Sequence, residues 1–324
     1  MQKLIVILAS AFQFCVLTVS GQVRNEVAAV GFVTPRATLI APGELVTLYV
    51  RGLAAGPAVA SALPLPTNLA GVSVLIKQPG GFSALAPVVR ILPLDAAGLG
   101  CRGLGGGLIC RLTAVTIQVP TNLPFCEPDE GLGANPPSVC PGETSAVVAE
   151  NGVTGAEFMN LVVSPQQAHI INACDTMAFG SPARVIFGSC LPIILRADGS
   201  PVSGANPARP GEVVSVFAVG LGPTSVALPS GVPSPSPPIQ VALPVQFRFA
   251  FRTDIRPSEA LNNGEVLFAG LTPGFVGLYQ VNVRLPSEIP SEVRRCGLAP
   301  ADANMTLVIA AGRSADGVQI CLNP

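Results

Sequence analysis

Prolines and glycines interrupt this chain every few residues, and no other feature of the sequence restricts its fold more. The 324 residues include 33 prolines and 34 glycines. Proline breaks a helix and glycine weakens one, so this spacing leaves little room for long helices. The segments between them are short and rich in Val, Leu, Ile and Phe, as is typical of β-strands. The chain is therefore predicted to be all-β.

The clearest strand pattern runs from residue 245 to residue 252. Every second position in its first seven residues is apolar: Val245, Phe247, Phe249 and Phe251. A period of two puts these side chains on one face, which we expect to be buried. Further strands are expected at Leu45–Val50, Val72–Lys77, Val115–Val119, Val213–Val219, Tyr279–Leu285 and Met305–Ala310. Short strands separated by turn residues predict antiparallel β-sandwiches.

The two halves of the chain share three sequence matches that occur in the same order. The matched ranges are 41–46 with 209–214, 117–124 with 283–290, and 147–152 with 307–312. The spacing between matched residues drifts only from 168 to 166 to 160. Ordered matches of this kind predict two tandem copies of one folding unit. We expect a first sandwich domain at residues 22–164 and a second at residues 165–324.

A hairpin turn is expected at the end of each copy. Asn151-Gly152 is a strong two-residue turn, because both central positions of a type I′ turn need a positive φ. The third sequence match places Ala311-Gly312 at the same point of the second copy.

The N-terminus has the layout of a signal peptide over residues 1–21. Lys3 precedes an apolar run from Leu4 to Val19, and the small residues Ser20 and Gly21 follow. The run is short for a membrane span, so cleavage is expected, with an uncleaved anchor as the alternative. The mature chain is then expected to be secreted, in the extracellular space or at the cell surface, without a membrane span.

Cysteine usage agrees with secretion. The chain has nine cysteines, and cleavage of the segment that holds Cys15 leaves eight, an even number that favours disulfides. Neighbours in sequence are expected to staple loops, as the pairs Cys101–Cys110, Cys126–Cys140, Cys174–Cys190 and Cys296–Cys321. No C-x-x-C spacing occurs, so no metal or other cofactor is expected. One alternative stays open, a calcium loop or a solvated tip formed by Glu127, Asp129 and Glu130.

Charge and motif content exclude several functions. The formal net charge is −1 and only 11% of residues are charged, so nucleic acid is not an expected partner. His169 is the single histidine, and no G-x-S-x-G motif accompanies it. We interpret it as a satisfied histidine at the domain junction. The glycines 98, 100 and 103 fit a dinucleotide fingerprint only by letter, because no helix is expected after them. The chain is predicted not to be an enzyme.

The second half resembles a known family. The residues that carry the resemblance are 208–214 (ARPGEVV), 220–223 (GLGP) and 267–283 (LFAGLTPGFVGLYQVNV). They are similar to the Solibacter-type uncharacterised C-terminal domain family of secreted acidobacterial proteins. The first half, at residues 41–43 and 65–74, resembles the domain that often precedes it. The resemblance implies immunoglobulin-like sandwiches of the IPT/TIG type and an extracellular location, and it carries no assigned activity.

These observations predict a secreted, non-catalytic binding or structural module for adhesion, extracellular matrix or surface assembly. The expected partner is an extracellular protein or polysaccharide, or a second copy of the chain. A carbohydrate-binding accessory protein and a secreted hydrolase are the alternatives. The absence of tryptophan argues against a typical sugar platform. The candidate contact segment, with a spacer loop as its alternative, contains Pro229, Pro233, Pro235, Pro237 and Pro238.

Overall fold

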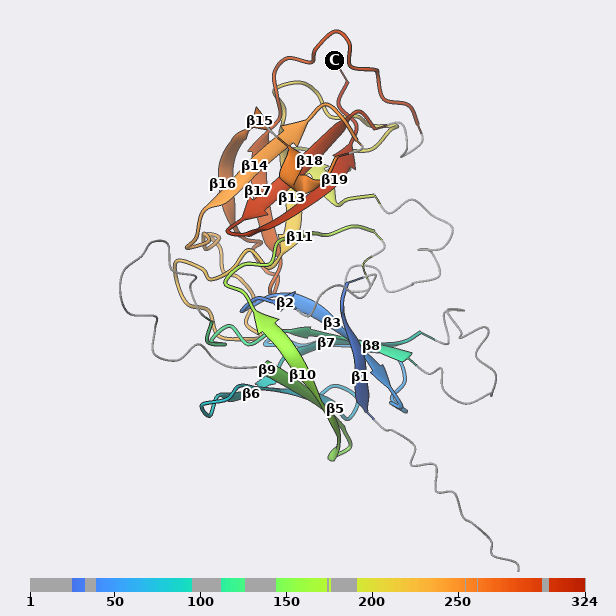
Figure 1. Cartoon of the computed structure of the whole chain (residues 1–324), viewed down its shortest axis with the longest axis vertical. Coiled ribbons are helices and arrows are strands. Elements are labelled where there is room, and N and C mark those ends of the chain that lie inside the picture. Colours follow the sequence, from blue (N-terminus) through green and yellow to red (C-terminus); the bar gives the residue numbers. More distant parts are fainter. Residues whose placement is uncertain are drawn as a thin grey trace, which may run out of the picture.

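The computed structural model describes nine ranges of the chain. They are residues 25–32, 39–94, 112–125, 144–173, 175, 191–253, 255–260, 262–298 and 303–323. Within them the fold is all-β, as predicted, with four sheets arranged as two sandwiches stacked along the long axis (Figure 1). A 3-10 turn, η3 (Pro257–Glu259), is the helical element of this part. None of the described helices could cross a membrane.

The first sandwich packs two five-stranded sheets face to face. One sheet has the order β1 (Glu26–Gly31), β3 (Leu45–Arg51), β8 (Leu112–Gln118), β7 (Val88–Pro93) and β4 (Ala58–Val59). The other has the order β2 (Leu39–Ile40), β10 (Val153–Val163), β9 (Thr144–Glu150), β5 (Val72–Lys77) and β6 (Ser83–Ala86). Alternate residues of β5 are buried in the core between the sheets, as the period of two requires: Val72, Val74 and Ile76.

The second sandwich repeats this plan. One sheet has the order β11 (His169–Ile170), β13 (Val213–Val219), β17 (Tyr279–Arg284) and β16 (Glu265–Leu271), with β12 (Ile194–Arg196) also paired to β13. The other has the order β15 (Asn262–Asn263), β14 (Val245–Ala250), β18 (Met305–Ala311) and β19 (Ser314–Ile320). Phe247 and Phe249 of β14 are 1% and 9% exposed, and Val245 and Phe251 pack against the same core. The predicted buried face is confirmed.

Strand register shows that the two sandwiches are copies. Leu45 lies opposite Gln118 in the first, and Val213 lies opposite Arg284 in the second. These partners are related by the spacings of 168 and 166 found in the sequence. The next strand, β7 or β16, has a register shift near its start in both copies. An extra residue at the same place in both ladders is a shared structural feature rather than a local irregularity.

The two hairpins differ in their turns. Asn151 and Gly152 have φ values of 50° and 79°, as the type I′ prediction requires. In the second copy Ala311 pairs with Ser314, so the turn consists of Gly312 and the residue after it. The predicted Ala311-Gly312 turn is therefore wrong by one position. Of the two turn residues only Gly312 has a positive φ, 57°, which fits the type II′ turn with glycine first.

One predicted disulfide lies within the described residues. Cys296 and Cys321 are bonded, with 5.5 Å between their Cα atoms, so this pairing is confirmed. The bond ties the chain after β19 to the loop that precedes β18. The other six predicted cysteines, the signal peptide and the acidic loop between Cys126 and Cys140 lie outside the described residues.

Candidate functional site

The chain passes between the sandwiches through a short linker that is bonded at both ends. It leaves β10 at Val163 and enters β11 at His169. The amide of Ser164 donates to a carbonyl of the first sandwich, and that of Gln167 donates to Gly220 in the second. Gly220 has a φ of +72°, and a Cβ there would lie 2.0 Å from the Gln167 carbonyl oxygen. The linker therefore packs so closely against the second sandwich that position 220 has room only for glycine.

Directly after the linker, His169 lies between two carboxylates. Its Nε2 is 2.9 Å from Oδ2 of Asp175, and its Nδ1 is 3.0 Å from Oδ2 of Asp316. The three residues are 5%, 1% and 8% exposed, in that order. Each carboxylate oxygen also accepts a backbone amide at 2.9 Å, from Asn172 and Ile170 respectively. These amides hold the carboxylates in place, so the imidazole is clamped from both sides.

This environment keeps the imidazole charged. Burial alone would lower the pKa of His169, but the hydrogen bonds and charges of Asp175 and Asp316 outweigh it and raise the pKa to about 9. The ring of Phe32, which follows β1 of the first sandwich, stacks on the imidazole at 3.7 Å between centroids. The interplanar angle of 9° places the charged ring flat on the aromatic face.

The first sandwich contributes a titratable residue, Glu44, to the same junction. It is fully buried, and its Oε2 accepts the amide of Ala41 at 2.7 Å. Its Oε1 has no hydrogen-bond partner within the described residues. Burial raises the pKa of Glu44 to about 8, against the lowering effects of the Ala41 amide and the His169 charge. At neutral pH the side chain is therefore a neutral acid. We call Phe32, Glu44, His169, Asp175 and Asp316 the junction cluster.

Residues of the second sandwich pack around Glu44. A Cβ placed on Gly220 would lie 3.3 Å from its carboxyl carbon. Burial raises the pKa of Tyr279, and the charge of Glu44 raises it further. The Tyr279 hydroxyl donates to the carbonyl of Gly222 at 2.5 Å. Glu44 is thus enclosed by the partner sandwich.

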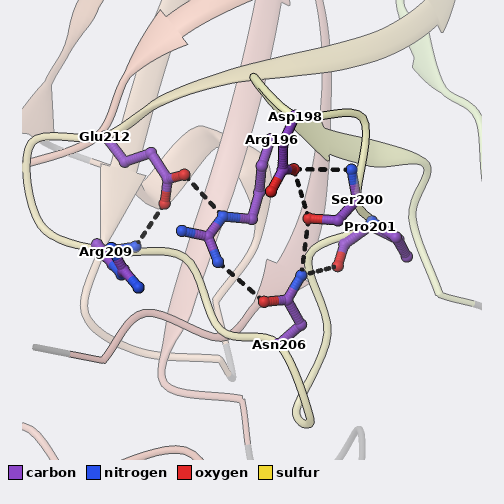
Figure 2. A network of polar contacts seen from close by, with 7 residues as sticks. All are labelled: Arg196, Asp198, Ser200, Pro201, Asn206, Arg209 and Glu212. Carbon is purple, nitrogen blue, oxygen red and sulfur yellow. Dashed lines mark hydrogen bonds and ion pairs between the residues drawn. The ribbon is translucent and has the colours of Figure 1, made fainter.

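The repeat supplies a counterpart of Glu44 at the other end of the molecule. Oε2 of Glu212 accepts the amide of Arg209 at 2.8 Å, as Oε2 of Glu44 accepts the amide three residues before it. Its Oε1, however, accepts Nε of Arg196 at 2.7 Å (Figure 2). The guanidinium also donates to Oδ1 of Asn206 at 2.8 Å. The same turn therefore carries an ion-paired glutamate here and an unpaired, neutral one at the junction.

The network around Arg196 continues through two further side chains. The Asn206 amide donates to Oγ of Ser200 and to the carbonyl of Pro201 (Figure 2). Asp198 accepts both the amide and the hydroxyl of Ser200, at 2.9 and 2.6 Å. The polar side chains at this end of the second sandwich are thus hydrogen-bonded to one another in one network.

Strand register shows which residue of the first sandwich occupies the position that Arg196 has in the second. Gly31 lies opposite Thr47, and Leu195 lies opposite Ser215, the matching residue 168 positions later. The residues that follow are therefore equivalent: Phe32 in the first sandwich and Arg196 in the second. At the junction an aromatic ring replaces the cation, and His169 brings the positive charge from the other sandwich.

The predicted contact segment begins at the junction. The Ser230 hydroxyl accepts the amide of Thr121 at 2.9 Å. Gly231 donates to Oε1 of Gln118 at 2.6 Å and accepts the amide of Leu65 at 2.9 Å. Among its prolines, 229, 235 and 237 are exposed, and 233 and 238 are half-buried. The segment bridges the sandwiches with its first residues, and its role as a docking site stays a prediction.

An open hollow of about 470 Å³ lies at the end of β17 away from the junction. In the first sandwich the position of Phe251 is taken by Gln78. The Gln78 amide donates to the carbonyl of Pro124 at 2.9 Å and to Oγ1 of Thr144 at 3.0 Å, which closes that end. The hollow is therefore a feature in which the two copies differ. Its lining includes Phe251, Asn262, Asn263, Glu265, Arg284 and Pro290.

Sequence reasoning found only part of the junction cluster. It placed His169 at the junction, and there the structure pairs the imidazole with two carboxylates. It missed the roles of Glu44, Phe32 and Asp316. The matched Pro-Gly-Glu turns held no signal for Glu44, because the cation that pairs with Glu212 is Arg196, which lies outside the matched ranges.

Comparisons with known proteins do not add a family. The scan against protein-family models finds no match, and the search of curated proteins returns no relative. The resemblance to the Solibacter-type family therefore stays an expectation from the sequence.

Proposed function

We propose that this chain is a secreted, non-catalytic binding or structural module, whose two sandwiches present their surfaces as one rigid body. Its role would be adhesion, matrix formation or surface assembly. The observation that supports this most is the junction itself. Buried side chains, a bonded linker and the Ser230–Gly231 contacts all join the two sandwiches. A pair of sandwiches held at fixed spacing suits multipoint contact with an extended partner.

The state of His169 supports a non-catalytic role. Both ring nitrogens face carboxylates, and the ring lies under Phe32. A general base must reach the proton that it removes from a substrate. A clamped imidazole that is 5% exposed is poorly suited to that task and well suited to holding a junction.

An apolar surface beside the junction is the favoured contact region. Phe275 is 56% exposed, and its carbonyl accepts the amide of Ser234 in the proline-rich segment. Pro235 and Pro237 of the same segment are exposed. Exposed aromatic and proline residues on two segments joined by a hydrogen bond suit an extended protein partner.

The hollow at Phe251 favours a second candidate, a carbohydrate-binding accessory protein. Asn262 and Asn263 line the hollow together with Phe251, and Glu265 and Arg284, which also line it, form an ion pair of 2.8 Å. One aromatic face with planar polar groups is the chemistry that recognises a sugar ring.

Binding of the intact chain to cell-envelope proteins and to insoluble polysaccharides tests both candidates. We expect Phe275→Asp to abolish protein capture and Phe251→Ala to leave it unchanged. Leu298→Asp is the matched control, because Leu298 is 82% exposed and follows Cys296 near the other end of the second sandwich. Retention of a polysaccharide that Phe251→Ala abolishes would favour the second candidate, and equal capture by all three variants would contradict the contact region.

A further inference from the structure

We propose that the junction cluster is a proton-operated latch, which holds the two sandwiches in one orientation and releases them when its protons are lost. The inference concerns the regulation of the rigid body proposed above and rests on that proposal. It does not depend on which partner the chain binds.

The cluster couples the sandwiches because each supplies part of it. Phe32 and Glu44 belong to the first sandwich, and His169, Asp175 and Asp316 belong to the second. The imidazole stacks on one of the first sandwich's side chains and is charge-coupled to the other. Any change in the charge of this cluster therefore changes the interaction energy between the two sandwiches.

Protonation decides how much charge the junction must bury. With both protons in place, the positive imidazole of His169 faces the two aspartates, and Glu44 is neutral. Loss of the Glu44 proton adds a negative charge to a fully buried site. Loss of the imidazole proton then leaves Asp175 and Asp316 facing a neutral ring. Buried uncompensated charge is costly, and separation of the sandwiches relieves it by admitting water.

The titratable groups around the cluster decide whether the latch opens at acidic or at alkaline pH. Asp175 and Asp316 flank the imidazole, Glu44 faces it from the first sandwich, and Tyr279 lies beside Glu44. The pKa values of about 8 for Glu44 and about 9 for His169 place both proton losses above neutral pH. The latch is therefore closed at neutral and mildly acidic pH and opens on the alkaline side.

The other copy of the turn provides an internal control. Glu212 forms an ion pair with Arg196, with 2.7 Å between Oε1 and Nε. Both of its carboxylate oxygens accept hydrogen bonds, Oε1 from Arg196 and Oε2 from the amide of Arg209. A change at Glu212 should leave the junction untouched, whereas the same change at Glu44 should alter the release.

Single-molecule energy transfer between the sandwiches tests the latch. Dyes are attached through non-natural residues at Ser83 and Ser258, which are exposed on different sandwiches. We expect one narrow distance population at about pH 7 and a second, broad one that grows reversibly towards about pH 10. Circular dichroism confirms that the sandwiches stay folded. One unchanged population up to that pH, with the fold intact, would overturn the latch.

Matched variants separate the latch from a general loss of stability. Glu44→Gln, which stays neutral, should move the release to higher pH, and Glu212→Gln should follow the wild type. Because the chain has one histidine, NMR follows the His169 imidazole without assignment, and we expect a midpoint near 9. A midpoint near the ordinary value of 6.5, or equal release pH in both glutamine variants, would refute the proposal. Binding is not part of the readout, so this failure is distinct from failure of the proposed function.

Discussion

A rise in pH should destabilise the folded chain, and the junction cluster fixes the sign. The pKa of His169 rises from 6.5 to about 9 on folding. Its contribution is fully present below the unfolded value and is lost as the pH rises through the folded value. The pKa of Glu44 rises from 4.5 to about 8, so its folded form keeps a proton that the unfolded chain releases. Stability is then lost across that interval as well.

The magnitude follows from about 1.4 kcal/mol per unit of pKa difference. Between about pH 7 and about pH 10, His169 should cost about 3 kcal/mol and Glu44 about 1 kcal/mol. While the junction stays closed, the wild-type free energy of unfolding should therefore fall by about 4 kcal/mol over this range, and release of the sandwiches limits the fall. Glu44→Gln has no proton to lose at that position, so its decline should be about 3 kcal/mol.

Urea unfolding at a series of pH values, followed by circular dichroism, measures this decline. Glu212→Gln serves as the control and should show the wild-type slope, because Glu212 is already paired with Arg196. A free energy of unfolding that stays flat or increases above neutral pH would refute the reasoning. Equal slopes for wild type and Glu44→Gln would show that Glu44 is not held protonated.

Three further predictions test other parts of the account. Phe249→Ala should cost about 3–5 kcal/mol in urea unfolding, because the ring lies in the second core; an unchanged midpoint would contradict this packing. Gly220→Ala should destabilise more than Gly199→Ala, since both have a positive φ but only Gly220 meets the Gln167 carbonyl; equal melting temperatures would rule out the close approach. Partner binding should depend weakly on salt, because 11% of residues are charged; a steep dependence in titrations at two salt concentrations would exclude an apolar contact.

The sequence sufficed for the architecture where the pattern was local or repeated. The alternation in β14 set the buried face of Phe247 and Phe249, because a strand's side chains alternate by geometry alone. The spacing of 168 between the Pro-Gly-Glu turns also relates the strands that follow them, because β3 pairs with β8 in the same register as β13 pairs with β17. The predicted position of the second hairpin turn was wrong by one residue, because a sequence match does not reveal which residues face each other across two paired strands.

The junction cluster was largely beyond local patterns. Asp316 lies on β19, far along the chain from His169, and only the closed sandwich brings the two together. Glu44 is buried because a second sandwich covers its turn, whereas Glu212 in the matching turn is half-buried and ion-paired. The environment of a repeated residue depends on what covers it, so the repeat alone could not assign different charge states to the two glutamates.

Residual dipolar couplings measured for both sandwiches in one aligned sample test the central claim, that the junction makes the two sandwiches one rigid body. Amides in β3 and β8 report on the first sandwich, and those in β13 and β17 report on the second. At neutral pH the account predicts one alignment tensor, with the same magnitude and orientation from both sets. Two tensors of different magnitude would show that the sandwiches move independently and would contradict the account.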